Sequence, residues 1–151
     1  MADLIDVAAI EEVHDLYRID PSEFVEARAS LVKQLRAEGR KDEAKAVVKL
    51  RKPSVASWAL DQVAVDQPEL IEAALGAVAA LQVATTETLE GDASNLRSAT
   101  DAERTAVSAV TDAAAVHLPT LTADHRERMM ATLRAAITDE AVRSQLTAGL
   151  L

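Results

Sequence analysis

The chain has 151 residues, a formal net charge of −9 and no cysteine. Its length is that of one ordinary domain, which can bury a core without covalent staples. The absence of cysteine excludes disulfides, thiolate metal ligands and thiol catalysis, and it fits a reducing, cytoplasmic compartment. The segment after Met1 is acidic and lacks the basic start and apolar stretch of a signal peptide, so we expect a cytoplasmic protein.

The composition predicts an all-α fold. Hydrophobic residues make up 49% of the chain, but aromatic residues only 2%, and four glycines and four prolines serve its whole length. Strands favour β-branched and aromatic residues, whereas abundant alanine with few helix breakers favours long helices. We therefore expect a bundle of seven to eight helices, with short helices in the N-terminal part and longer Ala-rich helices in the C-terminal part.

Helix start and stop signals divide the N-terminal part. Apolar periodicity predicts a first helix over 4–17. Asp20 followed by Pro21 is a typical helix start, and Gly39 is a typical C-terminal stop, so a second helix is expected between them. A short helix over 42–50 follows. Pro53 then interrupts the helical pattern, and a fourth helix follows it and extends to about residue 66.

The C-terminal part shows longer apolar segments. We expect helices over 67–90 and 93–117, a seventh capped by Thr122, and a last one capped by Thr138 that ends near Gly149. The helix over 67–90 is apolar nearly all round, which is typical of a central helix or of an oligomer contact. Its longest apolar run, 73–84, is too short to span a bilayer, so we expect a buried helix and no membrane partner. Residues 1–66 and 67–151 are expected to pack as two parts of one folded unit.

Charge is segregated along the chain. Residues 33–52, the basic segment, contain eight bases and three acids, while the flanking parts are acidic. On a helix of 3.6 residues per turn, Lys41, Lys45, Lys49 and Lys52 fall on one narrow face. That face is either solvated, paired with acids of the same fold, or a ridge that binds phosphates of a nucleic acid. The candidate binding residues are Lys33, Arg36, Arg40, Lys41, Lys45, Lys49 and Lys52.

Three residues near the basic segment are expected to have structural roles. Arg51 falls near the apolar side of its helix, so we expect it to pair with Asp61 or Glu23 and to join two helices. Pro53 separates two helices. Trp58 lies on an apolar stripe, which favours core packing over base stacking.

The sequence lacks the motifs of an enzyme or a metalloprotein. A Glu-x-x-His pattern ends at His14, but a diiron site needs a second one, and His117 and His125 have no carboxylate three residues earlier. No serine stands in a Gly-x-Ser-x-Gly elbow, and the four glycines are too far apart for a phosphate-binding loop. We therefore expect no metal, no cofactor and no enzymatic activity.

Two segments resemble a known family. The first contains Leu50-Arg51-Lys52-Pro53-Ser54 followed by Trp58-Ala59-Leu60, and the second covers Ala131–Ala136 and Ala148–Leu151. Together they resemble an uncharacterised all-helical family of high-GC Gram-positive bacteria, in which asparagine often stands at the position of Asp61. The resemblance implies a bacterial, cytoplasmic protein with an interaction role, and it implies no chemistry.

These observations lead to two functional hypotheses. The first is a non-enzymatic helical interaction module that binds another protein or a second copy of itself through its Ala-rich helices. The alternative is a nucleic-acid or phosphate-binding protein that uses the bases at 33–52.

Overall fold

The computed structural model describes residues 4–151, and it is all-helical as predicted, with no strand among the described residues. Two short 3-10 helices, η1 (Val7–Ala9) and η2 (Pro21–Glu23), precede longer elements. The α-helices are α1 (Glu11–Leu16), α2 (Phe24–Ala37), α3 (Lys41–Val48), α4 (Val55–Asp66), α5 (Pro68–Leu89), α6 (Leu96–Ala115), α7 (Ala123–Thr138) and α8 (Glu140–Ala148).

The single helix predicted over 4–17 is wrong, because the chain breaks at Ile10. Asp6 accepts a hydrogen bond from the Ala8 amide and closes the short η1 turn. Ile10 is extended, with φ −89° and ψ 108°, and its side chain is 2% exposed. The extended residue therefore carries an apolar side chain into the core, and α1 starts only after it.

Helices α2 and α3 form an antiparallel hairpin that follows the predicted signals. Asp20 accepts from the Ser22 amide at the start of η2, which leads directly into α2. After α2, Gly39 adopts a φ of +78°, and the Arg40 amide donates to the Leu35 carbonyl, the pattern of a Schellman stop. The left-handed residue reverses the chain, so α3 packs back against α2.

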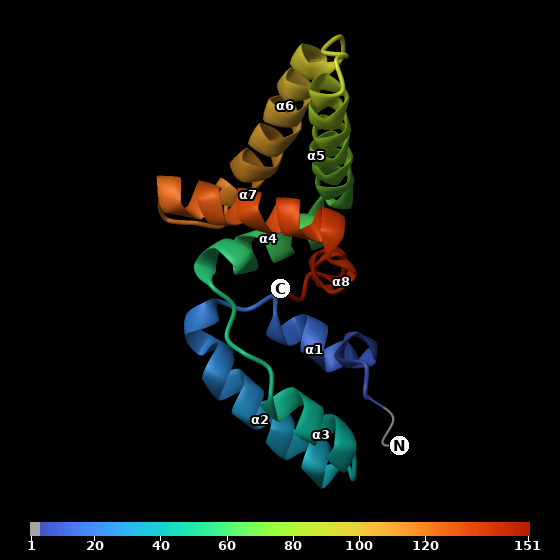
Figure 1. Ribbon diagram of the computed structural model, residues 1–151. Coiled ribbons are helices and arrows are strands. Elements are labelled where there is room, and N and C mark those ends of the chain that lie inside the picture. Colours follow the sequence, from blue (N-terminus) through green and yellow to red (C-terminus); the bar gives the residue numbers. More distant parts are fainter. Residues whose placement is uncertain (1–3) are drawn as a thin grey trace.

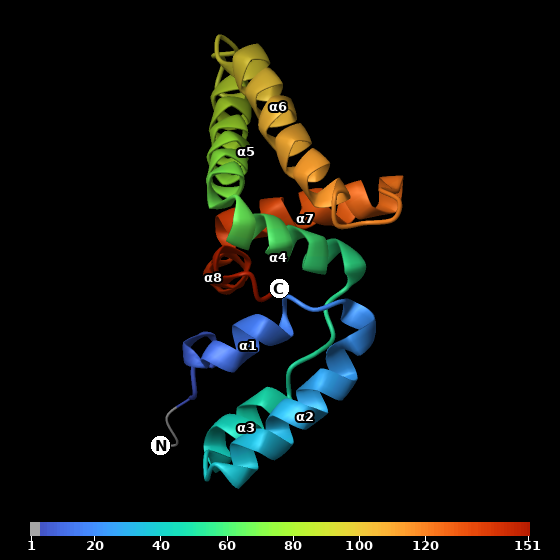
Figure 2. The ribbon, with the colours of Figure 1, turned by 180° about the vertical axis from the view of Figure 1, so that it is seen from behind.

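Helix α4 lies at the centre of the larger part of the molecule. It starts after the buried Pro53, where Ser54 caps it by accepting from the Ser57 amide. It packs against four helices, α5, α6, α7 and α8. Figure 1 shows α4 and α7 side by side, with the α5–α6 hairpin standing on them and α8 on the other side. Figure 2 shows the same arrangement from behind.

The boundary between α7 and α8 differs by one residue from the prediction. Thr122 caps α7 as expected, in a reciprocal pair with His125. The predicted cap of the last helix, Thr138, is instead the final residue of α7. Asp139 is extended and accepts from the amides of Ala141 and Val142, so it caps α8. An aspartate at this position can satisfy two free amides at once, which fixes the break there.

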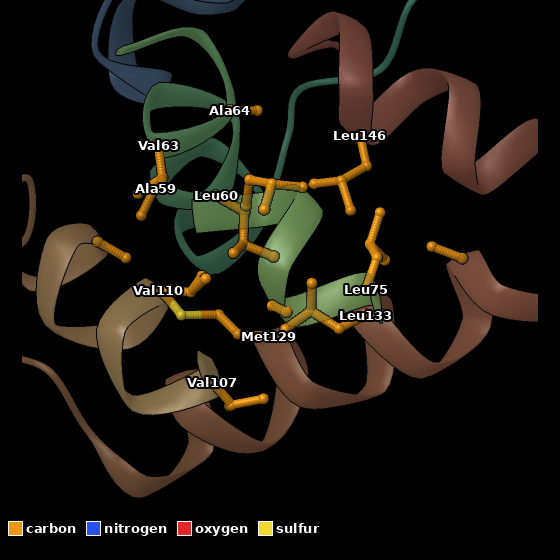
Figure 3. Close-up of a cluster of buried hydrophobic side chains, with 14 of the residues drawn as sticks. Ala59, Leu60, Val63, Ala64, Leu75, Val107, Val110, Met129, Leu133 and Leu146 are labelled. Atoms are coloured by element: carbon orange, nitrogen blue, oxygen red, sulfur yellow. The ribbon is translucent and has the colours of Figure 1, made fainter. Parts of the chain in front are cut away.

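Two apolar clusters form the core. The larger cluster draws on α4 to α8, and Figure 3 shows Leu60, Met129, Leu133 and Leu146 converging within it. The smaller cluster draws on α1, α2 and α3 and includes Leu150 from the C-terminal end. Helix α4 thus belongs with the C-terminal helices, and the division between the clusters falls in the segment before α4 rather than at residue 66.

Candidate interaction surface

Helix α5 has an apolar surface that the rest of the chain leaves largely uncovered. An 18-residue window of this 22-residue helix has a mean hydropathy of 1.3, yet only 28% of the window is buried. By length and composition it is the one helix among the described residues that could cross a membrane. We expected a buried helix over 67–90, and the structure buries only part of it, its inner face.

The uncovered face of α5 has small and branched apolar side chains. Its inner face, with Ile71, Leu75 and Val78, packs into the larger cluster. Val83 on the outer side is 58% exposed, and Leu89 at the end of the helix is 85% exposed. Ala73, Gly76 and Ala80 are exposed as well. A second helix could therefore approach this face closely.

Gly76 has no conformational reason to be glycine. It lies in the interior of α5 with helical backbone angles, and a Cβ added there would meet nothing within 4 Å. Glycine in a helix interior costs about 0.5–1 kcal/mol relative to alanine. We expect Gly76→Ala to raise the free energy of unfolding by about that amount, as measured by urea denaturation. An unchanged or lower stability would show that the folded protein requires glycine at position 76.

A cleft adjoins this face between α5 and α8, with α4 at its base. Its volume is about 450 Å³. Ile71, Leu75 and Gly76 line the α5 side, and Thr147 lines the α8 side. Glu72 and Arg143 face the same space from α5 and α8. Across the part of the chain that the structure describes, no carboxylate lies within ion-pair distance of Arg143.

The charges of α5 are confined to its two ends. Glu69 and Glu72 stand near the start, and Glu87 and Glu90 stand at the end, with no basic residue anywhere in the helix. A shallower groove beside Gln82, Val83 and Glu87 continues from the cleft, because Ala79 lines both. The α5 surface is therefore an apolar strip that lies between two acidic ends.

The predicted basic residues lie on α2, at the turn after it, on α3 and in the segment after α3, so Lys52 does not belong to the helix that carries Lys41 and Lys45. Lys41, Lys45 and Lys49 are exposed, on the side of α3 opposite its buried residues Ala44 and Val47. The other exposed bases lie elsewhere. Lys33 and Arg36 are on the outer side of α2, and Lys52 is beyond the end of α3, in the extended segment that leads to Pro53.

Arg40 is paired inside the fold. Its guanidinium donates to the Glu12 carboxylate at 2.7 Å, to Glu38 at 3.1 Å, and to Glu43. The hydrogen bond from Arg40 holds the pKa of Glu12 below its usual value, and hydrogen bonds from Gln34 and Arg40 do the same for Glu38. These acids also raise the pKa of Arg40 itself. Arg40 therefore joins α1 to the α2–α3 turn. For this base, the structure has the alternative in which the bases pair with acids of the same fold.

The three predicted structural residues have different outcomes. Arg51 is exposed, and in the described chain it forms no ion pair with Asp61 or Glu23, so that prediction is wrong. The physical reason is that α3 ends at Val48, which places Arg51 outside the helix. Pro53 is buried. Trp58 is half-buried and contacts His117 edge to face, with ring centroids 6.0 Å apart.

Asp61 is a buried acid whose environment the sequence did not reveal. It is 1% exposed, its Oδ1 accepts from the Leu151 amide at 2.9 Å, and its Oδ2 has no hydrogen-bond partner. Burial raises the pKa of Asp61 to about 8. The available signal was its place in α4 beside Gln62, between the buried apolar residues Leu60 and Val63. From the sequence, the one role expected for Asp61 was an ion pair with Arg51.

Within residues 4–151, no group of three or more His, Asp or Glu side chains is placed to hold a metal ion. Comparison of the chain with family models, with curated proteins and with solved structures found no match. The α5 surface and its cleft are therefore the best-defined candidate site.

Proposed function

We propose that this protein is a non-enzymatic interaction module that binds an apolar helix of a protein partner along α5. The observation that supports the proposal is the contrast between the high hydropathy of α5 and the small buried share of its surface. Exposed apolar area of this kind marks interaction sites in soluble proteins. Docking of a helix onto an apolar groove is a recurring recognition mode, and it would cover Val83 and the strip beside it.

The charges of α5 define the kind of helix that fits. Glu72 and Glu87 are fifteen residues apart in the sequence, which places them about 22 Å apart along the helix axis. A partner helix would therefore need an apolar face of about that length, with basic residues at both ends. Such a partner would gain affinity from the burial of its apolar face and orientation from its terminal charges.

The same charges disfavour a second copy of α5 as the partner. In an antiparallel pair, Glu69 and Glu72 of one copy would face Glu87 and Glu90 of the other. In a parallel pair, each acid would face its own counterpart. Both arrangements bring like charges together across an apolar interface, which costs several kcal/mol. A basic partner avoids this repulsion.

A designed peptide tests the proposal directly. The probe is a helical Ala/Leu peptide of about 20 residues with two lysines at each end, labelled for fluorescence anisotropy. We expect saturable binding that Val83→Lys weakens at least about tenfold, because a charged side chain would interrupt the apolar strip and repel the lysines of the probe. Val25→Lys is the matched control, since Val25 is 52% exposed on α2, far from α5 in the sequence.

Three results would contradict the proposal. The first is the absence of binding to the wild-type protein. The second is equal loss of binding in Val83→Lys and Val25→Lys. The third is equally tight binding of a peptide with glutamates in place of the lysines, because this would remove the role of the acidic ends. Sedimentation of the protein alone tests self-association, and a dimer that Val83→Lys dissociates would replace the partner helix with a second copy.

A second candidate function rests on the exposed lysines of α3. Lys41 and Lys49 have no carboxylate within ion-pair distance among residues 4–151, and Lys45 has only the exposed Asp42 at 3.7 Å. Three adjacent ammonium groups on one solvent face can contact successive phosphates of a nucleic acid. The acidic remainder of the chain would oppose any wider contact.

Binding to labelled single- and double-stranded DNA and RNA, measured at several salt concentrations, tests this candidate. If the lysines bind phosphates, changing Lys41, Lys45 and Lys49 together to Glu abolishes binding, and changing only one reduces the salt slope by about one. The control changes Arg97, Arg104 and Arg126 to Glu, which alters the net charge equally at exposed positions elsewhere. No binding at low salt, or equal loss in the control, would exclude the lysine site.

A further inference from the structure

We propose that the cleft between α5 and α8 is the anchor pocket of the α5 surface, and that it receives one large apolar side chain from the partner helix. This inference rests on the proposed function and adds to it the place and chemistry of the main contact. Protein interfaces usually concentrate their binding free energy in a few side chains that fill well-formed pockets. The cleft is the one such hollow that adjoins the apolar strip near its start, among the residues that the structure describes.

The walls of the cleft suit an aliphatic or aromatic side chain. Helix α8 packs on α4 and α7, and the cleft lies between its other side and α5. Ile71 and Leu75 form the inner wall, and Ala64 of α4 forms the base. A volume of about 450 Å³ admits a leucine or phenylalanine side chain together with the adjoining turn of its helix.

The rim of the cleft has one acidic and one basic side chain on opposite sides of its apolar interior. Glu72 lies on the α5 side and Arg143 on the α8 side, and neither forms an ion pair with another described residue. A partner that brings a basic residue to Glu72 and an acidic residue to Arg143 would satisfy both. The inferred ligand is therefore an amphipathic helix whose apolar anchor is flanked by one base and one acid.

Gly76 gives access to the pocket. It lines the cleft at its exposed edge, and its missing Cβ leaves the space beside the α5 backbone open. A leucine placed there can occupy that space without a clash at Cβ, because outside the adjoining backbone of α5 no heavy atom lies within 4 Å of the Cβ position. Gly76→Leu would thus fill the entrance from within, whereas Gly76→Ala adds only one methyl group.

The experiment combines these variants with a set of probe peptides. In each peptide one leucine of the Lys-ended probe is changed to alanine, and each is titrated against wild type, Gly76→Ala and Gly76→Leu. We expect one position at which Leu→Ala weakens binding to wild type about tenfold or more, because a buried leucine is lost. The same change should have little effect on binding to Gly76→Leu, since the pocket is already filled. Thermal unfolding of each variant confirms that it is folded.

A small probe tests the pocket without any peptide. The anion 4-methylvalerate carries a leucine-like side chain and a carboxylate for Arg143. In a ¹⁵N amide titration at millimolar concentrations, we expect shifts confined to the residues around the cleft, including Gly76 and Thr147, and their loss in Gly76→Leu. Shifts that persist unchanged in Gly76→Leu, or no shifts in wild type, would overturn the pocket.

The two proposals fail in different ways. If no Lys-ended peptide binds while 4-methylvalerate binds in the cleft, the helix partner is wrong and the pocket stands as a site for a small apolar anion. If peptides bind and Val83→Lys weakens them, but Gly76→Leu and every Leu→Ala peptide behave as wild type, the α5 surface is supported and the anchor pocket is overturned.

Discussion

Replacement of Asp61 by asparagine is expected to stabilise the protein by about 5 kcal/mol at pH 9, with almost no effect at pH 4. The carboxyl is 1% exposed, and burial raises its pKa to about 8, from an ordinary value of 3.8. The folded protein therefore holds a neutral Asp61 at pH 7, whereas the unfolded chain holds a charged one. Asparagine has the same shape and keeps an oxygen that can accept from the Leu151 amide.

The direction of the pH dependence follows from proton counting. Between pH 4 and pH 8 the folded state binds one proton more at Asp61 than the unfolded state does. The stability of the wild type therefore falls as the pH rises through this range, and the loss is complete above the folded pKa. The asparagine side chain has no proton to lose in this range, so the variant lacks this pH dependence. Each unit of pKa shift corresponds to about 1.4 kcal/mol, which gives the expected difference.

Urea denaturation at several pH values measures the effect. The wild type and Asp61→Asn should have similar midpoints at pH 4 and should diverge steadily up to pH 8. Asp112→Asn is the control, because Asp112 is exposed on α6 and its curve should run parallel to that of the wild type. A constant offset between wild type and Asp61→Asn at all pH values would show that Asp61 has an ordinary pKa in the folded protein.

Sequence signals located those parts of the fold that depend on local chemistry. The helical start after Asp20, which is that of η2 leading into α2, and the stop at Gly39 were predicted correctly, because an aspartate before proline and a glycine after the last helical turn act within a few residues. The cap of α7 at Thr122 was predicted for the same reason. The break at Ile10 was missed, because it depends on the burial of that side chain by helices distant in the sequence.

The candidate site was harder to predict, because composition does not tell which face of a helix its neighbours cover. Helix α5 is apolar on most sides, and the sequence could favour either a central helix or a contact surface. The contacts of α5 with α4, α6 and α7 leave part of its apolar surface exposed, and this exposure supports the proposal of a contact surface. The position of Arg51 had a usable signal, because the residue before a proline disfavours helix and Lys52 precedes Pro53. It predicts that the helix ends before Lys52, so that Arg51 lies in an extended segment and is exposed.

The two apolar clusters are expected to unfold together, and Phe24→Ala tests this. Phe24 is 1% exposed in the smaller cluster, where its ring contacts Tyr17 edge to face at 5.4 Å. Its truncation should cost about 3–5 kcal/mol. Trp58, the one tryptophan of the chain, contacts His117 of the segment after α6 and reports on the larger part of the molecule. If the clusters form one unit, the Trp58 fluorescence transition shifts to lower urea by the full amount.

Three connections between the clusters support this expectation. Gln62 of α4 donates to the Tyr17 carbonyl at 3.0 Å, and both groups are buried. Arg18 pairs with Asp66 at 2.8 Å. Leu150 packs in the smaller cluster, while the adjacent Leu151 packs against the larger one and donates to Asp61. Buried links of this kind couple the stability of the parts that they join, whereas the exposed ion pair adds little.

A comparison of two spectroscopic signals shows whether the two clusters unfold together. Far-UV circular dichroism follows all helices, and Trp58 fluorescence follows the larger cluster alone. Coincident transitions in Phe24→Ala, both shifted from wild type, would show that the chain is one cooperative unit. An unchanged Trp58 transition, with an earlier partial loss of helix, would show that α1 to α3 unfold independently. Val25→Ala, at an exposed neighbouring position, should leave both signals as in the wild type.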